Sequence, residues 1–226
     1  MFTMIERMPV AGTDGRRERK KRETRARIQD AALELFATHG YRDTTIAAIA
    51  DHADVATRTV TLHFPAKEDL LFADDPFTPG SLGLRLGSRD PQEDTLDALR
   101  DWMRTTMRSL DASDAEQPQD LGRVWRRRAL RSRLLMDDDD LRGRARAGYR
   151  ELEQLVAAGI GQDLGQAADA LLPRLTASTV VSGLREIYAT REGQEKAGSA
   201  ASELFDLVDD VLTFARAGMT ELAGTR

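Results

Sequence analysis

A short segment with a polar outward face, residues 56–63, carries side chains that suit contact with another molecule. At helical spacing, Val60 and Phe64 face inward and leave the opposite side exposed. The outward side chains are Thr57, Arg58, Thr59, Thr61 and Leu62. Side chains of these types, presented on a helix, form hydrogen bonds and apolar contacts with the edges of nucleic-acid bases. The segment is therefore a candidate recognition helix.

A strongly basic run precedes this segment, although the chain as a whole is acidic. Residues 16–27 hold eight basic and two acidic residues, a net charge of +6, whereas the 226-residue chain has a formal net charge of −5. Such a run suits a DNA backbone, and it is also typical of a solvated helix face or a flexible tail. We expect residues 1–21 to form a flexible basic arm.

Three helices are needed to position the outward face. Apolar residues recur at helical spacing over residues 22–38, and Gly40 stands where a helix C-terminal cap needs a positive φ. Thr44 or Thr45 can cap a short second helix, and a tight turn at residues 54–55 leads into the third. Two short helices joined by a tight turn predict a helix-turn-helix, whose second helix fits the major groove of DNA. A three-helix packing unit that binds nothing is the alternative.

Three spaced motifs extend the pattern beyond the helices themselves. They are A-x-x-L-F-x-x-x-G-Y at residues 32–41, T-T-x-x-x-I-A at residues 44–50 and H-F-P-x-K-E-x-L at residues 63–70. With them, the stretch from Ile28 to Leu71 closely resembles the N-terminal domain of the tetracycline-repressor (TetR) family of bacterial transcriptional regulators. The resemblance implies a dimer in which paired recognition helices read a palindromic operator. It also implies an all-helical C-terminal domain that holds a ligand pocket and the dimer interface.

The resemblance assigns roles to single residues. It implies base or groove contact for Thr57, Arg58, Thr59 and Leu62. It implies contact with DNA phosphates for Thr45, Thr61, His63 and Lys67. The basic arm, chiefly Arg19, Lys20, Lys21, Arg22 and Arg25, is expected to follow phosphates or to enter the minor groove. Because arginine can donate two hydrogen bonds to O6 and N7 of guanine, Arg58 is the expected specificity residue.

Two positions depart from the family pattern. Ala56 stands where the family often has a serine N-cap, and Thr61 replaces a frequent aromatic residue. Thr57 is an alternative cap, and in that role its hydroxyl would bind a backbone N–H instead of a base.

The remaining two thirds of the chain show helical periodicity interrupted by polar segments. The spacing predicts helices over residues 92–110, 120–136, 139–160, 168–190 and 199–219. Pro, Gly, Ser and Asp dominate residues 74–91, which predicts a loop or irregular connector. We expect an all-α fold with the arm at residues 1–21, a helix-turn-helix DNA-binding domain at residues 22–73 and a helical effector-binding and dimerisation domain at residues 74–226.

The last two predicted helices carry apolar stripes. One stripe consists of Leu172, Leu175, Thr179, Gly183 and Ile187, and the other of Leu204, Leu207, Val208, Val211 and Phe214. In a monomer such stripes form core, whereas the family resemblance implies a four-helix interface between two subunits. Gly183 is expected to permit close helix approach, so Gly183→Leu is expected to weaken the dimer.

An effector pocket is expected among the middle helices. The large side chains available to line it are Trp102, Met103, Met107, Trp125, Tyr149 and Tyr188. Such a lining suits an apolar or planar molecule, and an ordinary core position is the alternative for each residue. The second basic run, at residues 123–133, is predicted to be a solvated helix face. Within it Arg128 is the candidate to face inward and neutralise an acidic effector.

Composition excludes several chemistries. The chain has no cysteine, which excludes disulfides, thiolate nucleophiles and cysteine-ligated metals. No familiar catalytic or phosphate-binding motif is present, so no catalytic residue and no cofactor are expected. The four aspartates at residues 137–140 are expected to cap the following helix rather than to bind a metal. No apolar run is long enough for a membrane span, which favours a cytoplasmic protein without a membrane partner.

The sequence therefore favours a homodimeric, ligand-responsive transcriptional regulator, above all a repressor. Its expected partners are a double-stranded DNA operator and a small-molecule effector of unknown identity. A DNA-binding protein without an effector, either constitutive or architectural, is the first alternative. An enzyme on a helical scaffold is the remote one.

Overall fold

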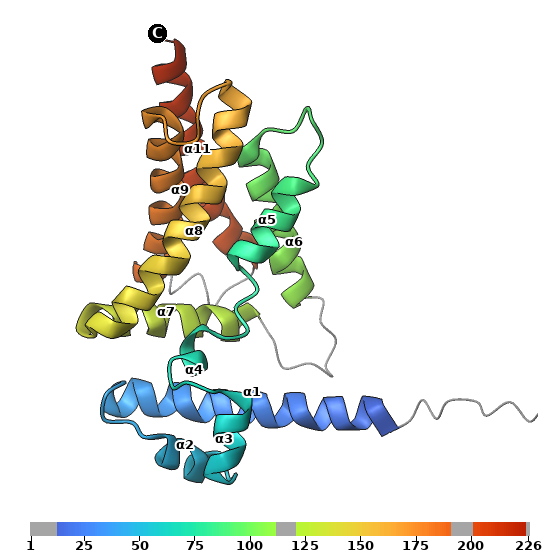
Figure 1. The fold of residues 1–226 in the computed structure, drawn as a ribbon, viewed down its shortest axis with the longest axis vertical. Helices are drawn as coiled ribbons and strands as arrows, with labels where there is room; N and C mark the ends of the chain where they lie inside the picture. Colours follow the sequence, from blue (N-terminus) through green and yellow to red (C-terminus); the bar gives the residue numbers. More distant parts are fainter. Residues whose placement is uncertain (1–12, 112–120, 191–200, 225–226) are drawn as a thin grey trace, which may run out of the picture. The chain divides into compact units, whose positions relative to one another are not determined.

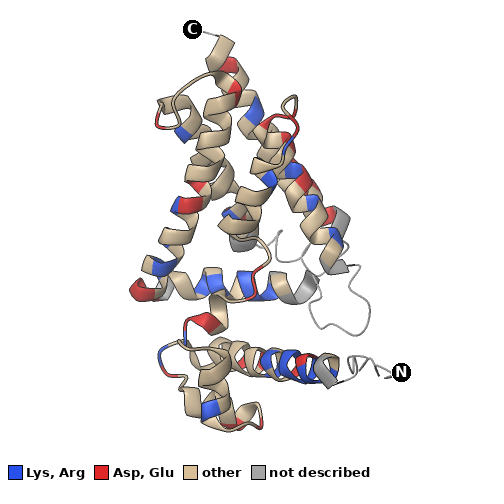
Figure 2. Ribbon diagram, turned by 45° about the vertical axis from the view of Figure 1, so that its right-hand side comes forward, with Lys and Arg blue, Asp and Glu red and all other residues tan. Residues whose placement is uncertain are grey.

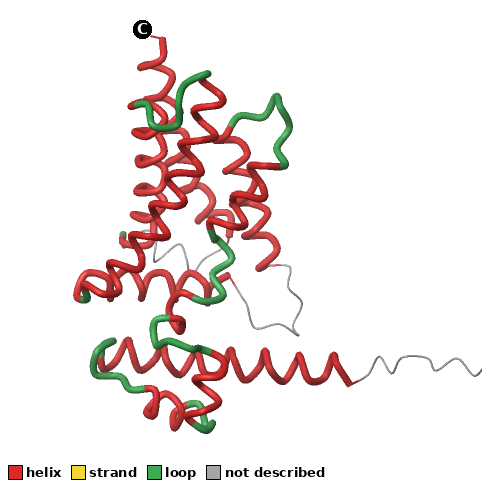
Figure 3. The backbone as a smooth tube through the Cα atoms, in the orientation of Figure 1, coloured by secondary structure: helices red, strands yellow, loops and turns green. Residues whose placement is uncertain are grey.

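The computed structural model of the chain describes residues 13–111, 121–190 and 201–224. Within these ranges every regular element is a helix, which confirms the predicted all-α fold class (Figures 1 and 3). The chain divides into two compact units, Met1–Leu71 and Phe72–Arg226. The division lies two residues before the predicted boundary between residues 73 and 74. None of the described helices is long and apolar enough to cross a lipid bilayer.

The first unit contains helices α1 (Thr13–His39), α2 (Ile46–His52) and α3 (Thr57–His63). Helix α4 (Asp69–Phe72) includes the last residues of the first unit and the first residue of the second. Helix α1 begins at Thr13 rather than at Arg22, so the basic residues that we expected in a flexible arm are helical from residue 13 onward. Arginine, lysine and glutamate are good helix formers, and Arg19 pairs with Glu23 one turn later at 3.5 Å.

The core of the first unit is formed by residues at the predicted spacing. The buried side chains are Ile28, Ala31, Ala32 and Phe36 of α1, Ile49, Ala50 and Ala53 at α2, Val60 and Phe64 at α3, and Leu70 and Leu71 of α4. Gly40 ends α1 with a φ of +84°, and Asp54 makes the tight turn between α2 and α3 with a φ of +51°. Thr45 caps α2 by accepting a hydrogen bond from the Ala48 N–H at 3.1 Å. These caps fix where the helix-turn-helix begins and ends.

The second unit contains α5 (Pro79–Gly87), α6 (Thr95–Asp111), α7 (Leu121–Asp137), α8 (Asp139–Leu164), α9 (Leu171–Ala189) and α11 (Ala201–Gly224). The prediction of an irregular connector over residues 74–91 was wrong, because α5 lies within it. Thr78 and Ser81 form a capping box, and Pro79 occupies the first turn, where its missing N–H costs no helical hydrogen bond. Proline and serine at these positions start a helix instead of preventing one.

The hydrophobic core of the second unit is built mainly from α6, α8, α9 and α11. Its buried side chains include Leu96, Leu99, Trp102, Met103 and Met107 of α6, Val156 and Ile160 of α8, Val180 of α9, and Leu204, Val208 and Leu212 of α11. The four long helices therefore form the frame on which α5 and α7 pack (Figure 1).

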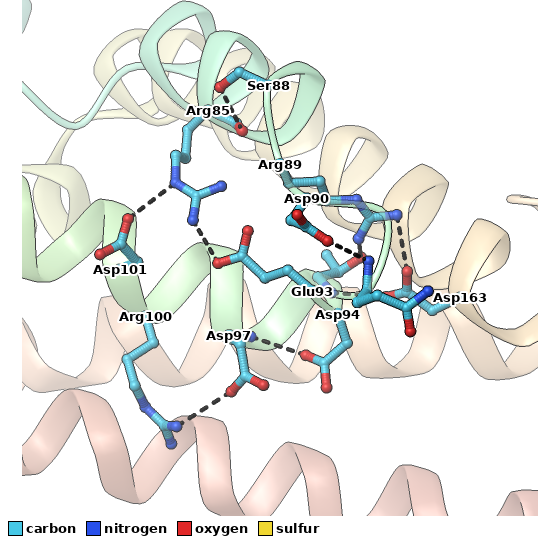
Figure 4. Close-up of polar contacts among 12 residues, drawn as sticks. Arg85, Ser88, Arg89, Asp90, Glu93, Asp94, Asp97, Arg100, Asp101 and Asp163 are labelled. Atoms are coloured by element: carbon cyan, nitrogen blue, oxygen red, sulfur yellow. Dashed lines mark hydrogen bonds and ion pairs between the residues drawn. The ribbon is translucent and has the colours of Figure 1, made fainter.

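Polar side chains join the start of α6 to its neighbours (Figure 4). Arg85 of α5 pairs with Glu93 and with Asp101, the latter at 3.0 Å. Arg89 pairs with Asp163 of α8 at 2.8 Å, and the same carboxylate accepts a hydrogen bond from the Thr95 N–H at 2.7 Å. Most of these pairs are partly exposed, so each contributes at most about 1 kcal/mol. Together they hold the α5–α6 loop against α8.

Helix α8 approaches α6 closely at Gly159. A Cβ added to Gly159 would lie 2.6 Å from Oγ1 and 2.8 Å from Cγ2 of Thr95. Because Thr95 is fully buried, its side chain has little room to move aside. We expect Gly159→Ala to lower the free energy of unfolding by about 1–3 kcal/mol, measured by urea denaturation.

Gly143→Ala is the matched control in the same helix. An added Cβ there meets no atom of the described residues within 4 Å, so alanine should stabilise the helix by about 0.5–1 kcal/mol. Equal stabilisation by both substitutions would show that α8 and α6 are not in contact at Gly159.

Candidate nucleic-acid interface and ligand cavity

Helix α3 presents the predicted recognition face. Val60 and Phe64 are buried, whereas Thr57, Arg58 and Thr61 are exposed, and Thr59 is half-buried. Leu62, an apolar side chain, is 81% exposed. The face thus combines a guanidinium and hydroxyls with an uncovered apolar group, which is the combination that reads base edges and thymine methyl groups.

The N-terminus of α3 has no side-chain cap. Ala56 is the N-cap residue and α3 begins at Thr57, so the alternative that Thr57 supplies the cap was wrong. The hydroxyl of Thr61 donates a hydrogen bond to the Arg58 carbonyl oxygen at 3.1 Å. The hydroxyl of Thr57, in contrast, is not used to cap its own helix.

The candidate phosphate contacts also have structural roles within the unit. Thr45 caps α2 through its hydroxyl oxygen. Lys67 donates hydrogen bonds to the carbonyl oxygens of Tyr41 and Arg42, and its ammonium group lies 4.3 Å from the centre of the Tyr41 ring. Lys67 therefore links the loop before α2 to the segment that precedes α4.

His63 lies half-buried at the end of α3, beside Arg25 of α1. Burial, together with the positive charges of Arg25 and Lys21, lowers the pKa of His63 below its ordinary value of 6.5. The imidazole is therefore mostly neutral at pH 7. Arg25 donates a hydrogen bond to the His63 carbonyl oxygen and stacks over the Phe64 ring, with 4.1 Å to its centre.

The basic run divides into two groups in the structure. Arg19, Lys20, Lys21 and Arg22 are exposed along α1, where Figure 2 shows a dense series of basic residues. Arg25 instead packs on Phe64 and positions the end of α3. The first group is placed to attract an anionic partner, whereas Arg25 links two helices of the unit.

A cavity of about 280 Å³ lies within the second unit. Most of its wall is apolar, and its aromatic and methionine side chains are Phe72, Phe77, Trp102, Met103 and Tyr149. The charged side chains of the wall are those of Asp75, Arg128, Arg131, Arg144 and Arg185. The indole N–H of Trp102 is buried without a hydrogen-bond partner in the described part of the chain. A concave, mostly apolar cavity with a few polar groups is the usual form of a small-molecule site.

The structure brings together some of the residues predicted to line a pocket. Trp102, Met103, Arg128 and Tyr149 line the cavity. Met107 is buried in the hydrophobic core and is not part of the wall, because it lies further along α6 than Met103. The side chains of Trp125 and Tyr188 lie outside the part of the structure that is described.

The prediction of a solvated face for residues 123–133 was wrong for three arginines. Arg127, Arg128 and Arg131 are only 5%, 9% and 8% exposed. Buried guanidinium groups require compensation, and the segment between α4 and α5 supplies it. Arg128 pairs with one carboxylate oxygen of Asp75, Arg131 donates to the other at 3.2 Å, and Arg127 donates to the Asp74 carbonyl oxygen at 2.8 Å.

The charges of this cluster shift the pKa values of its members. Burial would raise the pKa of Asp75, but the guanidinium groups of Arg128 and Arg131 lower it to about 2. Burial lowers the pKa of Arg127 to about 10, although Asp75 opposes the change. Asp75 and Arg127 are therefore both charged at pH 7.

The aspartate run behaves as predicted at Asp138. Its carboxylate accepts hydrogen bonds from the N–H groups of Asp140 and Leu141 at 3.0 and 3.1 Å and caps α8. Among the described residues, no group of three or more His, Asp or Glu side chains is arranged to hold a metal ion.

Part of the predicted dimer stripes belongs to the protomer's own core. Leu172, Ile187, Leu204 and Val208 are buried within the chain. Gly183 lies against α11 of the same chain, where an added Cβ would be 2.7 Å from Cγ1 of Val211. Gly183→Leu would therefore disturb the protomer itself, so a weaker dimer in that variant would not by itself locate the interface.

Comparison with known proteins agrees with this division into a helix-turn-helix unit and a cavity-bearing unit. Residues 28–73 match the model of bacterial regulatory proteins of the tetR family, and residues 93–220 match that of the MftR C-terminal domain. The HTH-type transcriptional regulator TcmR of Streptomyces glaucescens is 31% identical over 156 residues. That match spans 66% of this chain and 66% of TcmR, just under two thirds of each.

Two solved structures share the fold. The SmeT–triclosan complex, SmeT being a repressor from Stenotrophomonas maltophilia, has a TM-score of 0.57 at 22% identity, covering 87% of this chain and 91% of SmeT. Thermus thermophilus FadR in complex with lauroyl-CoA has a TM-score of 0.51 at 20% identity, covering 86% of this chain and 94% of FadR. With both family models matched in order along the chain, the protein belongs to the TetR family and is a DNA-binding transcriptional regulator rather than an enzyme.

Proposed function

We propose that the protein is a homodimeric repressor that binds a palindromic operator and leaves it when a small organic molecule occupies the cavity. The observation that carries the proposal is the presence, in one chain, of an uncovered recognition face on α3 and a mostly apolar cavity in the second unit. Structural neighbours with bound lauroyl-CoA and triclosan support the use of such a cavity for organic ligands.

The mechanism is a shift between two populations of the dimer. Two recognition helices bind one face of DNA only when their separation matches about 34–36 Å, the distance between successive major grooves. A ligand that binds better to a dimer with another separation favours that form and lowers operator affinity. The acidic remainder of the chain limits non-specific adhesion to DNA, while the basic residues of α1 supply local attraction.

The experiment that tests the proposal is affinity selection of random DNA duplexes with the full chain at fixed moderate salt. We expect a palindrome to be enriched. Octanoate, triclosan and lauroyl-CoA would then be titrated against the complex with the selected duplex, followed by fluorescence anisotropy. If no sequence is enriched and the affinity for DNA depends only on the salt concentration, the proposal of a sequence-specific repressor is contradicted.

Operator binding that no ligand diminishes would instead favour a DNA-binding protein without an effector. The cavity is the observation that argues against this alternative, because a mostly apolar cavity lined by aromatic side chains is the usual form of a small-molecule site.

The dimer is proposed to form through the exposed apolar side chains of α9 and α11. On α9 these are Leu171 and Leu175, one turn apart, and on α11 they are Phe214 and Leu222, two turns apart. Phe214 is 72% exposed and Leu175 is 48% exposed, which is unfavourable in a monomer. A second copy of the chain would cover these side chains through a symmetric interface.

Phe214→Glu is therefore expected to convert the dimer into a monomer. A carboxylate buried in an apolar interface without a partner is strongly unfavourable, and sedimentation equilibrium should show the mass fall by half. Leu84→Glu is the matched control, because Leu84 is 78% exposed on α5 and should leave the mass unchanged. An unchanged dimer for Phe214→Glu would place the interface elsewhere.

A further inference from the structure

The wall of the cavity has an excess of positive charge. The side chains that line it include four guanidinium groups, those of Arg128, Arg131, Arg144 and Arg185, and one carboxylate, that of Asp75, a net charge of +3 for the lining side chains. Outside the wall, Glu186 lies 3.8 Å from Arg185 and is exposed, so it screens that arginine only weakly. An apolar cavity with this charge favours an anionic ligand over a neutral or cationic one.

Aromatic rings hold the guanidinium groups of the wall in place. Arg128 lies 4.6 Å from the centre of the Phe77 ring, Arg131 lies 5.2 Å from that of Phe72, and Arg185 lies 5.6 Å from that of Tyr149. Stacked arginines are oriented before a ligand arrives, so less side-chain freedom is lost when they bind an anion.

Asp75 occupies the position that a ligand's carboxylate would take. Its two oxygens accept hydrogen bonds from Arg128 and Arg131, which lie one turn apart on α7. Arginine pairs bind carboxylates of any origin through the same planar geometry. Asp75 lies in the connector between α4 and α5 and not in α7. A ligand carboxylate can therefore replace that of Asp75 without unfolding the helix that carries the arginines.

We propose that the effector is a small apolar carboxylic acid, whose carboxylate displaces that of Asp75 from Arg128 and Arg131 while its apolar part fills the cavity. This inference rests on the proposed function, because it takes the cavity as the effector site. The volume of about 280 Å³ lies just below the usual range of about 300–1,000 Å³ for small-molecule sites. It suits an acid with a short chain or one or two rings.

Displacement of Asp75 has a consequence for the chain. Arg127, Arg128 and Arg131 together hold residues 74–77, the segment that directly follows α4 at the end of the DNA-binding unit. A ligand that replaces Asp75 loosens this segment. Amide hydrogen exchange at Asp74, Asp75 and Phe77 is therefore expected to become faster when the ligand binds, and unchanged exchange would contradict the displacement.

The charge preference is tested by calorimetric titration of the full chain with three probes of equal length: octanoate, 1-octanol and octylammonium. We expect octanoate to bind at least tenfold more tightly than 1-octanol, and octylammonium to bind most weakly. Equal affinities for octanoate and 1-octanol, a preference for octylammonium, or binding of none of the three would each overturn the proposal.

Two variants test the role of the wall. Asp75→Asn removes the internal competitor, so octanoate is expected to bind about tenfold more tightly, with 1-octanol unchanged; an unchanged or lower octanoate affinity would overturn the displacement. If Asp75→Asn does not fold, Arg144→Gln tests the same charge preference at an exposed position of the wall. Arg144→Gln is expected to lower the affinity for octanoate about threefold or more without changing that for 1-octanol. An unchanged affinity for octanoate would overturn the proposal.

Arg133→Gln is the control, because Arg133 is exposed on the same helix as Arg128 but does not line the cavity. These measurements contain no DNA, so they fail independently of the proposed function. If octanoate is not preferred over the other probes, the proposal that the effector is a carboxylic acid is contradicted. That result says nothing about operator binding or release. A chain that binds octanoate selectively but is never released from its operator contradicts the proposed mechanism alone.

Discussion

Arg58→Ala is expected to lower affinity for the selected operator and to relax the base preference at one position of each half-site. Arg58 is exposed on α3 beside Thr57 and Thr61. Loss of a bidentate contact with guanine removes about 1–3 kcal/mol per base, and a dimer loses it in both half-sites. Affinity selection followed by titration with matched and mismatched duplexes would measure both effects.

Two further variants separate base reading from simple loss of charge. Lys21→Ala removes an exposed charge of α1 from each subunit, and it should weaken all duplexes similarly while lowering the salt slope by about two, one for each half-site. Arg133→Ala removes an exposed charge from α7 and should leave DNA binding unchanged. If Arg58→Ala behaves like Lys21→Ala, with the base preference intact, then Arg58 contacts the backbone and another residue reads the sequence.

Asp75→Asn is expected to lower the free energy of unfolding by about 3–5 kcal/mol. The substitution keeps the shape of the side chain but leaves Arg128 and Arg131 buried without their carboxylate. Urea denaturation at pH 7 measures the loss. Asp139→Asn is the control, because the Asp139 side chain is 87% exposed and its pair with Arg142 should contribute less than about 1 kcal/mol.

The ion pairs of Asp75 with Arg128 and Arg131 make the free energy of unfolding depend on pH in the acid range. The pKa of Asp75 falls from 3.8 to about 2 on folding, so the native state binds this proton less readily than the unfolded state. The resulting stabilisation, about 2 kcal/mol, is fully present above about pH 4 and is lost as the pH falls towards 2. Asp75→Asn should lack this part of the acid sensitivity. If the free energies of unfolding of the wild type and the variant changed in parallel between pH 4 and pH 2, Asp75 would not be ion-paired.

Local signals in the sequence were sufficient for the first unit from residue 22 onward. Gly40, Thr45 and the turn at Asp54 specify helix ends through their own φ angles and hydroxyls, without help from distant residues. The apolar spacing of Ile28, Phe36 and Val60 then determines which faces are buried. The prediction ended α1 correctly but started it too late, because a charged helix without an apolar stripe has no periodic signal at its start.

The cavity depended on contacts between segments far apart in the chain. Arg128 and Asp75 are separated by 53 residues, and nothing near the basic run of α7 shows that a carboxylate from another segment will neutralise it. Helix α5 was missed for a related reason, since the glycine and serine content of residues 74–91 outweighed the Thr78 cap and the Pro79 start. The signal that was available, a cap followed by proline, was local and specific.

The sequence alone determined the all-helical fold, the helix-turn-helix and the outward face of α3, because helix caps and apolar periodicity act over a few residues. Only the tertiary structure decided which charges are buried and which apolar side chains remain outside. Arg127, Arg128 and Arg131 have the same residue type as the exposed Arg126 and Arg133, and Leu175 differs from Leu172 only in its position on α9. Burial of a charge depends on whether a distant partner compensates it, and exposure of an apolar group depends on whether another helix covers it.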